Sequence, residues 1–451
     1  MKKLWWVVFA VVIRVLLSAF LYHPDVKTIN QEVKFFSNGI AHAYENSLKQ
    51  GVEMHYPPPI YLLLKAHQDW NRWMFSSNFD NWLKDGGVLQ TVNHEGIFRD
   101  LLVMKLPMML VDLLIGWMLV KGLDKGKKRL GLMLWLFNPV TLYAVYGIGN
   151  FDILAVGVLV LGWLMWNKNF KLFTYFLIGI AGGLKLFGLL LIPMLLTQRQ
   201  TIKSRIGGII LSGAGFGLCF LPILNSKAAL KSIFLSNLTS GIFQARINFS
   251  DTHFVSVFFV ILFGLWYWLM VKKDEVSFAQ IVFLTLAPVF ALSHFHPQWM
   301  VWLMPFMIIM YVNAQIRGRL LLLIIVSYFG VVLLINDKFV AFGMLKAVNN
   351  GFDSLQSIRW VLDKLNFGAQ IQSVMHSALS AFLFWGIWET CKSLKLEWSN
   401  PKWLLPRTVV FGLVGILGLG FVVSHLILAK YGVNIDHTIG NAILPIWIEE
   451  G

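Results

Sequence analysis

Residues 1–25 read MKKLWWVVFAVVIRVLLSAFLYHPD, and this stretch decides the fold. Lys2 and Lys3 precede an apolar run over residues 4–22, which has the length that a helix needs to cross the bilayer core. Because basic residues that flank a span stay in the cytoplasm, the N-terminus is expected to be cytoplasmic. The run lacks a small-residue cleavage site, so we expect a retained first span and not a signal peptide. Asp25 then lies at the outer membrane surface.

The composition is that of a membrane protein. Hydrophobic residues make up 57% of the 451 residues and charged residues 14%, and apolar stretches of span length recur along the chain. The net charge of +15 does not indicate nucleic acid, because the basic residues are spread over short loops, where they control topology and contact membrane lipids. Cys219 and Cys391 have no metal-ligand spacing and are not expected to form a disulfide.

Apolar runs that alternate with basic loops predict an all-α polytopic integral membrane protein with about eleven full spans. Outer loop 23–98 contains amphipathic pieces that are expected to form helices, and a second outer loop covers 336–372. We divide the chain into a transmembrane catalytic module, 1–335, and a C-terminal transmembrane part, 336–451. The expected spans are 4–22, 99–120, 130–146, 151–167, 207–224, 254–271, 277–293, 299–315, 318–335, 373–390 and 408–429.

The apolar segment 172–196 does not fit a single crossing. The basic residues of 199–205 follow it and would then face outward, and Lys185 would lie at the bilayer centre, where a charge is expensive. Both problems disappear if the segment is a re-entrant helical hairpin that turns near Gly183. Lys185 would then lie at the tip of the hairpin, in a polar cavity open to the outer face.

Unusual polar residues collect at the outer ends of these spans. Asp25 follows the first span, and a carboxylate partly withdrawn from water can act as a general base; the alternative is a solvated carboxylate at a helix end. Tyr56 precedes three prolines, which form either a structural corner or part of a site. Asn150 and Asp152 stand in a minimal turn between two spans, where Asp152 either caps a helix or contacts a ligand.

Two cationic residues on the same face are candidates to neutralise a phosphate. Lys185 offers a point charge at the tip of the hairpin, and Arg246 offers a bidentate fork in a later outer loop. For Arg246 the alternative is a solvated loop charge. The polar residues at the outer face therefore suggest chemistry there and not a simple pore.

The stretch from His294 to Trp299 joins two spans at the same face. His294 and His296 lack a third ligand nearby, so we expect no metal site, and imidazole donation to a phosphate or sugar oxygen is favoured. Gln298 suits sugar hydroxyls, and Trp299 suits the face of a sugar ring.

Taken in order, these motifs resemble the GT-C superfamily of integral-membrane glycosyltransferases, and in particular the bacterial relatives of polyprenyl- and dolichol-phosphate-mannose-dependent mannosyltransferases. The resemblance covers about residues 1–310. The motifs that carry it are His23-Pro24-Asp25, Tyr56-Pro57-Pro58, Lys105-Leu106-Pro107 with Asp112, Asn138-Pro139 with the turn Gly149–Asp152, Lys185 with Pro193, and His296–Trp299.

The resemblance implies an inverting transfer of a hexose, such as mannose, from a polyprenyl-phosphate-linked sugar donor to a hydroxyl of a glycan, glycolipid or other acceptor. It implies that Asp25 is the base, that the multi-pass protein lies in the cell membrane with its active site on the extracytoplasmic face, and that no cofactor, metal or nucleotide sugar is needed. The turn departs from the family pattern at Asn150, where relatives often have Gln.

Two other functions are compatible with a polytopic chain. A flippase or transporter of lipid-linked glycans would have charges in mid-span, and here only Lys185, Lys105 and Asp112 qualify. A polymerase of the O-antigen type would use several arginines in large outer loops, and these are sparse here.

Overall fold

The structure is a computed structural model that describes residues 5–85, 94–198, 200–234, 244–250, 253–271, 275–293 and 295–394. Helices dominate these residues, and the strands among them are β1 (Arg246–Asn248) and β2 (Phe254–Ser256), which pair antiparallel. The predicted all-helical class is therefore confirmed apart from this short hairpin.

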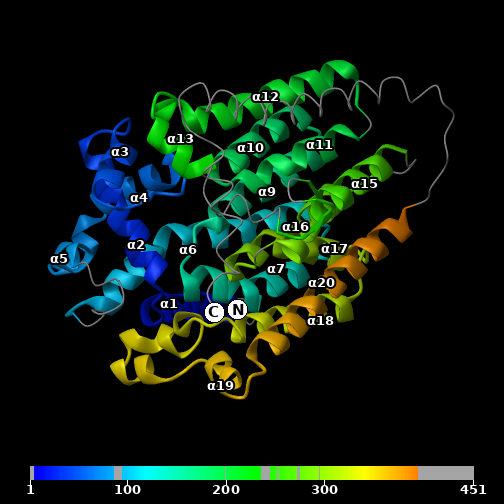
Figure 1. The fold of residues 1–451 in the computed structure, drawn as a ribbon. Helices are drawn as coiled ribbons and strands as arrows, with labels where there is room; N and C mark the ends of the chain where they lie inside the picture. Colours follow the sequence, from blue (N-terminus) through cyan, green and yellow to red (C-terminus); the bar gives the residue numbers. More distant parts are fainter. Residues whose placement is uncertain are drawn as a thin grey trace.

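Each expected span that falls within the described residues coincides with a helix or a series of helices. The long helices lie side by side in one bundle, with α10 (Lys171–Leu184) between α9 and α12 (Figure 1). The expected span 408–429 lies outside the described residues. The matching helices are α1 (Trp5–Phe20), α6 (Ile97–Gly122), α7 (Lys128–Leu136) with α8 (Pro139–Thr141) and η3 (Leu142–Ile148), α9 (Asp152–Asn167), α12 (Ile202–Phe220) with η5 (Leu221–Ile223), α15 (Val257–Val271), α16 (Phe278–Leu292), η7 (Pro297–Trp302) with α17 (Met304–Val312), α18 (Gly318–Leu333) and α20 (Gly368–Ser393).

Fewer of these helices reach the length of a membrane span than the sequence predicts. Three are long and apolar enough to cross by themselves, at Ile97–Gly122, Lys128–Ile148 and Ile202–Ile223, and a fourth is possible if α1 and the helix after it form one span bent by 77°. The other apolar helices have 10–17 residues, at or below the lower end of the length that a straight span needs.

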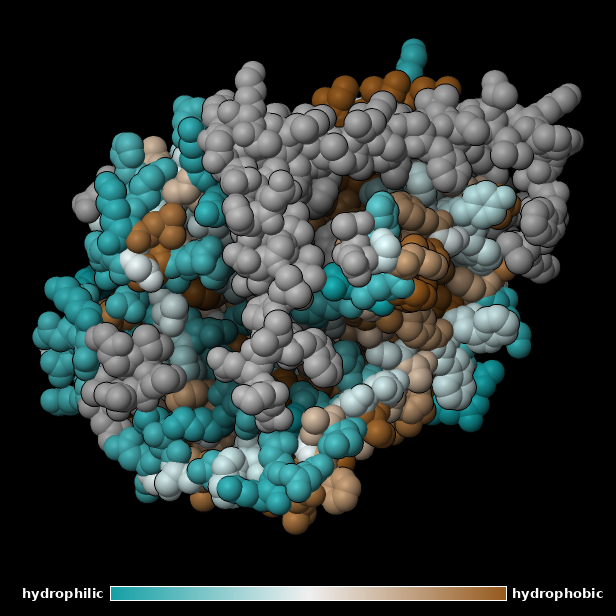
Figure 2. All heavy atoms as spheres, viewed as in Figure 1, coloured by the Kyte–Doolittle hydropathy of each residue, from teal (hydrophilic) through white to brown (hydrophobic). Residues whose placement is uncertain are grey.

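The outer surface of the bundle is apolar. Large hydrophobic side chains are exposed along one face of several helices, for example Phe263 on α15 and Trp388 on α20. Figure 2 shows hydrophobic surface beside α15 and α20, and hydrophilic surface at the left end of the molecule, from α3 (Ala43–Lys49) to α5 (Phe79–Lys84). Apolar faces of this extent are typical of contact with lipid, so the helices that carry them are suited to a membrane.

Short helices cover one end of the bundle, where the sequence predicted amphipathic helices. Pro24 and Pro58 stand at the first or second position of their helices, where a missing N–H costs nothing. The helix α13 (Lys227–Phe234) joins this layer, because Ser226 just before it donates to Glu45 over 2.5 Å. The helices of loop 23–98, which the sequence predicts to lie at the outer face, are α2 (Pro24–Glu32), η1 (Val33–Asn38), α3 (Ala43–Lys49), α4 (Pro58–Trp70), η2 (Arg72–Met74) and α5 (Phe79–Lys84) (Figure 1).

The second outer loop packs against the beginning of the chain. The N–H of Tyr22 donates to Met344 over 2.8 Å, and the hydroxyl of Tyr143 donates to the carbonyl of Val340 over 2.7 Å. Helices on both sides of residue 335 are thus in contact, and our division of the chain at that residue remains an interpretation of the sequence. The helices of this loop are η8 (Lys338–Val340), η9 (Phe342–Ala347), η10 (Asn350–Ser354) and α19 (Ile358–Lys364).

The segment 172–196 is broken in the middle and folds back on itself. Lys185 has extended backbone between α10 and the pair η4 (Leu186–Leu190) and α11 (Leu191–Leu196). Gly188 packs directly on Gly182, where a Cβ atom would lie 2.5 Å from the backbone nitrogen. The chain returns far enough for the Gln200 side chain to donate to the Tyr175 hydroxyl over 3.0 Å. The chain therefore reverses at Lys185, near the expected turn at Gly183.

We predict that both ends of this hairpin lie on the cytoplasmic side of the membrane. In a background with Cys219→Ser and Cys391→Ser, single cysteines at the exposed positions Lys168 and Lys203 should react with an impermeant maleimide from the same side. A cysteine at Asp69, in the outer layer, should react only from the other side. Labelling of positions 168 and 203 from opposite sides would show that the segment crosses the membrane once.

Candidate functional site

Asp25 lies at the start of α2, immediately beyond the end of α1. His23 caps this helix by accepting the Asp25 N–H with its Nδ1 over 3.2 Å, so the chain turns sharply between α1 and α2. The Asp25 carboxylate is 42% exposed and lies 3.5 Å from the same Nδ1. Burial lowers the pKa of His23, although the Asp25 charge opposes this. His23 thus remains a neutral acceptor near neutral pH, and the Asp25 carboxylate is accessible to an incoming group.

The turn with Asn150 and Asp152 lies against the segment that carries Asp25. The π-helix η3 ends at Gly149, which has φ +74°, a conformation that favours glycine. A Cβ atom at Gly149 would lie 2.1 Å from the Val26 side chain, so only glycine permits this approach. The Asn150 side-chain oxygen accepts the N–H of Asp152 over 2.8 Å. Asn150 therefore caps the turn, and the Asp152 carboxylate points elsewhere.

Lys185 brings the hairpin tip to this turn. Its ammonium group donates to the Asp152 carboxylate over 2.5 Å, and the two side chains are 18% and 3% exposed. Aromatic rings surround the ammonium, with centroids at 5.5 Å for Trp299 and 5.9 Å for both Tyr56 and Phe187. Cation–π attraction and a charge-assisted hydrogen bond together hold the ammonium in place.

Two polar atoms beside Lys185 have no hydrogen-bond partner among the described residues. They are Oδ2 of Asp152 and Nδ2 of Asn150, whose side chain lies near the Tyr56 hydroxyl without a close hydrogen bond to it, and both side chains are almost fully buried. A buried polar atom without a partner costs about 1–3 kcal/mol, so native proteins rarely leave one unpaired. An N–H donor and a carboxylate acceptor side by side are suited to the hydroxyl groups of a sugar.

Tyr56 lines the site on the side of the short helices of loop 23–98. Its ring packs edge-on against Phe151 and Tyr61, with centroids 6.1 and 6.5 Å apart. Burial, and then the negative charge of Asp152, raise the pKa of Tyr56 well above its ordinary value. The phenol therefore stays protonated and can donate a hydrogen bond at any physiological pH.

The segment from His296 to Trp299 reaches the same place from the other side. The His296 ring lies 4.4 Å from the Trp299 ring, and Trp299 packs edge-on against Phe187 at 4.8 Å. Tyr328 fixes the segment by donating its hydroxyl to the Pro297 carbonyl over 3.0 Å. Lys185 and His296 thus share contact with Trp299. Gln298 is partly buried in the same turn, and His294 lies outside the described residues.

We call Tyr56, Asn150, Asp152, Lys185, His296 and Trp299 the Lys185 cluster. Arg246 does not join it in the described part of the chain. Its guanidinium stacks on Phe254 at 5.0 Å across the hairpin of β1 and β2, and no ion pair links it to the cluster there. Within the described ranges, no group of three or more His, Cys, Asp and Glu is arranged to hold a metal ion. Comparison with models of protein families, with curated proteins and with solved structures finds no match to this chain.

Our sequence reasoning missed Glu32, a buried carboxylate in the outer layer. The Tyr61 hydroxyl donates to it over 2.8 Å, and Tyr61 in turn packs against Tyr56. Burial raises the pKa of Glu32 to about 7, and the Asp25 charge adds to this. The spacing of Asp25 and Glu32, seven residues apart on α2, places both on one helix face and was the available signal.

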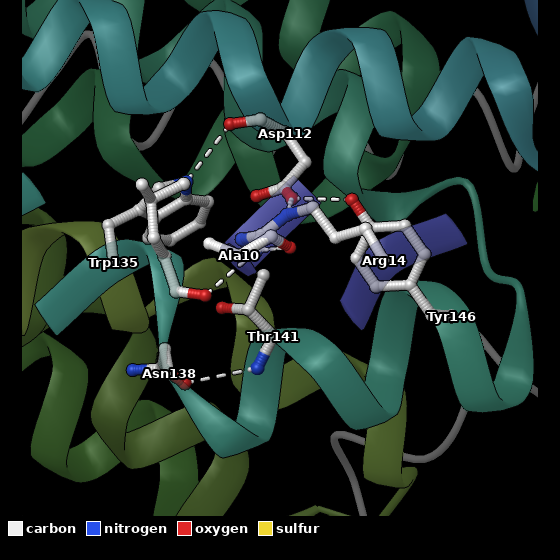
Figure 3. A network of polar contacts seen from close by, with 8 residues as sticks. Ala10, Arg14, Asp112, Trp135, Asn138, Thr141 and Tyr146 are labelled. Carbon is white, nitrogen blue, oxygen red and sulfur yellow. Dashed lines mark hydrogen bonds and ion pairs between the residues drawn. The ribbon is translucent and has the colours of Figure 1, made fainter. Parts of the chain in front are cut away.

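The sequence reasoning also missed Arg14, the one charged residue in the first apolar run. Figure 3 shows Arg14 and Asp112 facing each other inside the bundle, with both side chains fully buried. Arg14 Nε donates to Asp112 over 2.6 Å, and the Tyr146 hydroxyl donates to the same oxygen over 2.5 Å. Arg14 also donates to the Leu136 carbonyl over 2.8 Å. A charge within an apolar run is itself a signal of a buried partner.

We predict that Glu32 makes the protein less stable as the pH rises from about 4.5 to about 7. The folded protein binds this proton more tightly than the unfolded chain does, so deprotonation disfavours folding by up to about 3 kcal/mol. Glu32→Gln should remove this loss and keep the bond from Tyr61. Thermal unfolding at pH 5 and pH 8 measures the difference, with the exposed Glu53→Gln as control. An identical pH dependence in wild type and Glu32→Gln would contradict the prediction.

We predict that removing one partner of the Arg14–Asp112 pair destabilises the protein more than replacing both partners with apolar residues. Arg14→Met should destabilise the protein by roughly 3–5 kcal/mol, because it leaves a buried carboxylate without its cation, and Arg14→Met with Asp112→Leu should recover most of the loss. Lys65→Met, which breaks the partly exposed pair with Asp69, should cost less than about 1 kcal/mol. Thermal unfolding in lipid nanodiscs provides the comparison, and a fully stable Arg14→Met protein would refute it.

Proposed function

We propose that this chain transfers a hexose, such as mannose, from a polyprenyl-phosphate-linked donor to a hydroxyl of an extracytoplasmic acceptor, with inversion at the anomeric carbon. The observation that carries the proposal is the Lys185 cluster. It combines one sheltered ammonium, an unpartnered amide donor and an unpartnered carboxylate oxygen within aromatic walls. These are the groups that a sugar linked to a phosphate would need.

The phosphate half of the donor is assigned to Lys185 and His296. Lys185 is paired with Asp152 in the structure, and one of its three N–H groups makes that bond. A phosphate next to the ammonium would accept from the other N–H groups and gain charge-assisted hydrogen bonds. His296 and Lys185 both contact the Trp299 ring, so His296 belongs to the same aromatic wall. Arg246 and His294 are not needed for this arrangement.

The sugar half is assigned to the turn and to the residues that face it. Asn150 Nδ2 donates to one hydroxyl and Asp152 Oδ2 accepts from another, which gives both atoms their missing partners. Tyr56 and Gln298 supply further polar contacts, and Trp299 offers a ring face for the sugar. The hydrogen bonds hold the anomeric carbon at a fixed distance from the acceptor.

Asp25 is assigned as the base. The Gly149 turn touches Val26, so the Asp25 carboxylate and the sugar-binding turn come from adjacent backbone. The acceptor hydroxyl gives its proton to Asp25, its oxygen forms a bond to the anomeric carbon, and the bond from that carbon to the phosphate oxygen breaks. The electron pair stays on the phosphate, where Lys185 stabilises the charge.

The membrane arrangement belongs to the same proposal. We infer a GT-C-like fold with eleven crossings, a re-entrant hairpin, a cytoplasmic N-terminus and an outward-facing site in the cell membrane. The positions of the helices along the chain and the short helices over one end of the bundle support this arrangement. An apolar cavity of about 280 Å³ between α7, α17 and α18, lined by Phe137, Ile308 and Ile325, is suited to part of a lipid chain.

A transporter of lipid-linked glycans is the second candidate, because the Arg14–Asp112 pair lies in mid-helix. Charges that serve a transport pathway face a cavity, whereas Arg14 donates to Asp112 and to the carbonyls of Ala10 and Leu136 inside a packed core. Reconstitution in liposomes distinguishes the two functions. Movement of the lipid across the bilayer without any sugar transfer would favour the transporter.

We predict different defects for the phosphate ligand and the base. Lys185→Ala should weaken binding of polyprenyl phosphate by roughly 10- to 150-fold, the equivalent of a lost charge-assisted hydrogen bond, and lower turnover as well. Asp25→Asn should leave this affinity unchanged and reduce sugar transfer by about 10²–10⁴-fold. The measurements are equilibrium binding in nanodiscs and transfer from polyprenyl-phosphate-mannose to a cell-envelope extract.

Two matched controls keep this comparison interpretable. Lys171→Ala removes a lysine that lies over Trp166 at 5.2 Å, at the opposite end of the same helix, and should change neither quantity. Asp69→Asn neutralises an exposed carboxylate of the outer layer and should also be silent. Normal binding of polyprenyl phosphate by Lys185→Ala would contradict the assignment of the phosphate site. An active Asp25→Asn enzyme would contradict the assignment of Asp25 as the base.

A further inference from the structure

Lys105 is fully buried in α6 and its ammonium group joins the ends of two other helices. It donates to the carbonyl of Leu21, over 2.6 Å, and to the carbonyl of Tyr146, over 2.7 Å. Leu21 is the first residue after α1 and lies four residues before Asp25. Tyr146 lies in the last turn of η3, four residues before Asn150. One side chain therefore contacts both segments immediately before they enter the site.

The segments that carry Lys105, Gly149 and Val26 also contact one another beside the site. A Cβ atom on Gly149 would lie 2.1 Å from Val26 Cγ2 and 3.2 Å from Lys105 Cε. The turn before Asn150, the helix that follows Asp25 and the stem of Lys105 are thus packed without space between them. A change at Lys105 is therefore expected to shift the Gly149 turn relative to α2.

Tyr146 is held at its side chain as well as at its backbone carbonyl. Its hydroxyl donates to Asp112, which also accepts from Arg14 (Figure 3). Asp112 lies two turns from Lys105 on α6, so one helix holds Tyr146 by both its carbonyl and its hydroxyl. The π-helix η3, with its uncommon hydrogen-bond pattern, is therefore held against α6 at two points.

We propose that Lys105 is a positioning residue that fixes the distance between the Asp25 carboxylate and the Asn150–Asp152 turn. This inference rests on the proposed function, in which those groups hold the acceptor and the sugar. Carbonyls in the last turn of a helix lack intrahelical partners, and the helix dipole concentrates negative charge there. A single ammonium satisfies two such ends, α1 and η3, and holds them together although about 125 residues separate them in the chain.

The test separates binding from turnover. Lys105→Met should keep the affinity for polyprenyl phosphate within about threefold of wild type, because Lys185 and its neighbours are unchanged. Single-turnover transfer of mannose from polyprenyl-phosphate-mannose should fall by about 10- to 100-fold, the effect of a displacement of about 1 Å between reacting groups. Lys105→Gln retains two N–H donors and should recover part of the rate.

The control is Lys127→Met. Lys127 also makes two hydrogen bonds, to Asp124 and Asn313, both over 2.8 Å, but it lies beyond the C-terminal end of α6, immediately before α7. Its loss should change neither binding nor rate. Equal turnover in wild type and Lys105→Met would overturn the inference, and so would a loss of affinity that accounts for the whole defect.

Gly149→Ala provides a second route if Lys105→Met does not fold. The added methyl group meets Val26, and the positive φ of Gly149 disfavours alanine, so the turn should shift and turnover should fall while affinity for polyprenyl phosphate is kept. Val26→Ala in the same protein makes room for the methyl group and should restore part of the rate. A Gly149→Ala enzyme with wild-type turnover would refute the inference, whereas absence of transfer by wild type itself would refute the proposed function and the inference together.

Discussion

The structure depends on one constraint, which is that a charge inside an apolar bundle must find its partners inside the bundle. In water Arg14, Asp112 and Lys105 would be solvated separately, but here each is fully buried and joined to groups on other helices. Unlike apolar contacts, these bonds have direction and length. Apolar packing alone would allow neighbouring helices to slide or rotate by small amounts, whereas the polar contacts select one register of α1, α6 and η3.

The selected register brings distant parts of the chain to one place. Asp25 follows α1, and Asn150 and Asp152 follow η3. Lys105 of α6 bonds to the chain at the end of each of these two helices. Lys185 comes from the tip of the hairpin. The two arms of the hairpin pack closely because Gly182 contacts Gly188 directly. The site thus consists of loops and helix ends supported by a rigid apolar scaffold, an arrangement in which small changes in the loops alter specificity without altering the fold.

The positions of the helices along the chain could be predicted from the sequence, because uninterrupted apolar runs and the basic residues between them are typical of membrane helices. The break near Lys185 could be predicted from Lys185 itself and from the basic residues of 199–205. The partners of buried polar groups could not be read in this way. Whether Asp152 caps its own helix or pairs with Lys185 depends on where Asn150 points, and Arg246 lies on Phe254 because a local hairpin forms. Such choices are made by tertiary contacts, which a linear pattern does not encode.

If the proposed function holds, the charges of the site favour a phosphate-linked sugar over a neutral one. The Lys185 ammonium balances the Asp152 carboxylate over 2.5 Å, and the aromatic rings around them strengthen the attraction by lowering the local polarity. A neutral sugar would have to displace part of this pair and would bring no charge in return. A phosphate brings its own negative charge to the ammonium, so Asp152 can give up part of its bond and accept from a sugar hydroxyl. Binding of the two halves of the donor is then coupled through Lys185, which favours a ligand that carries both.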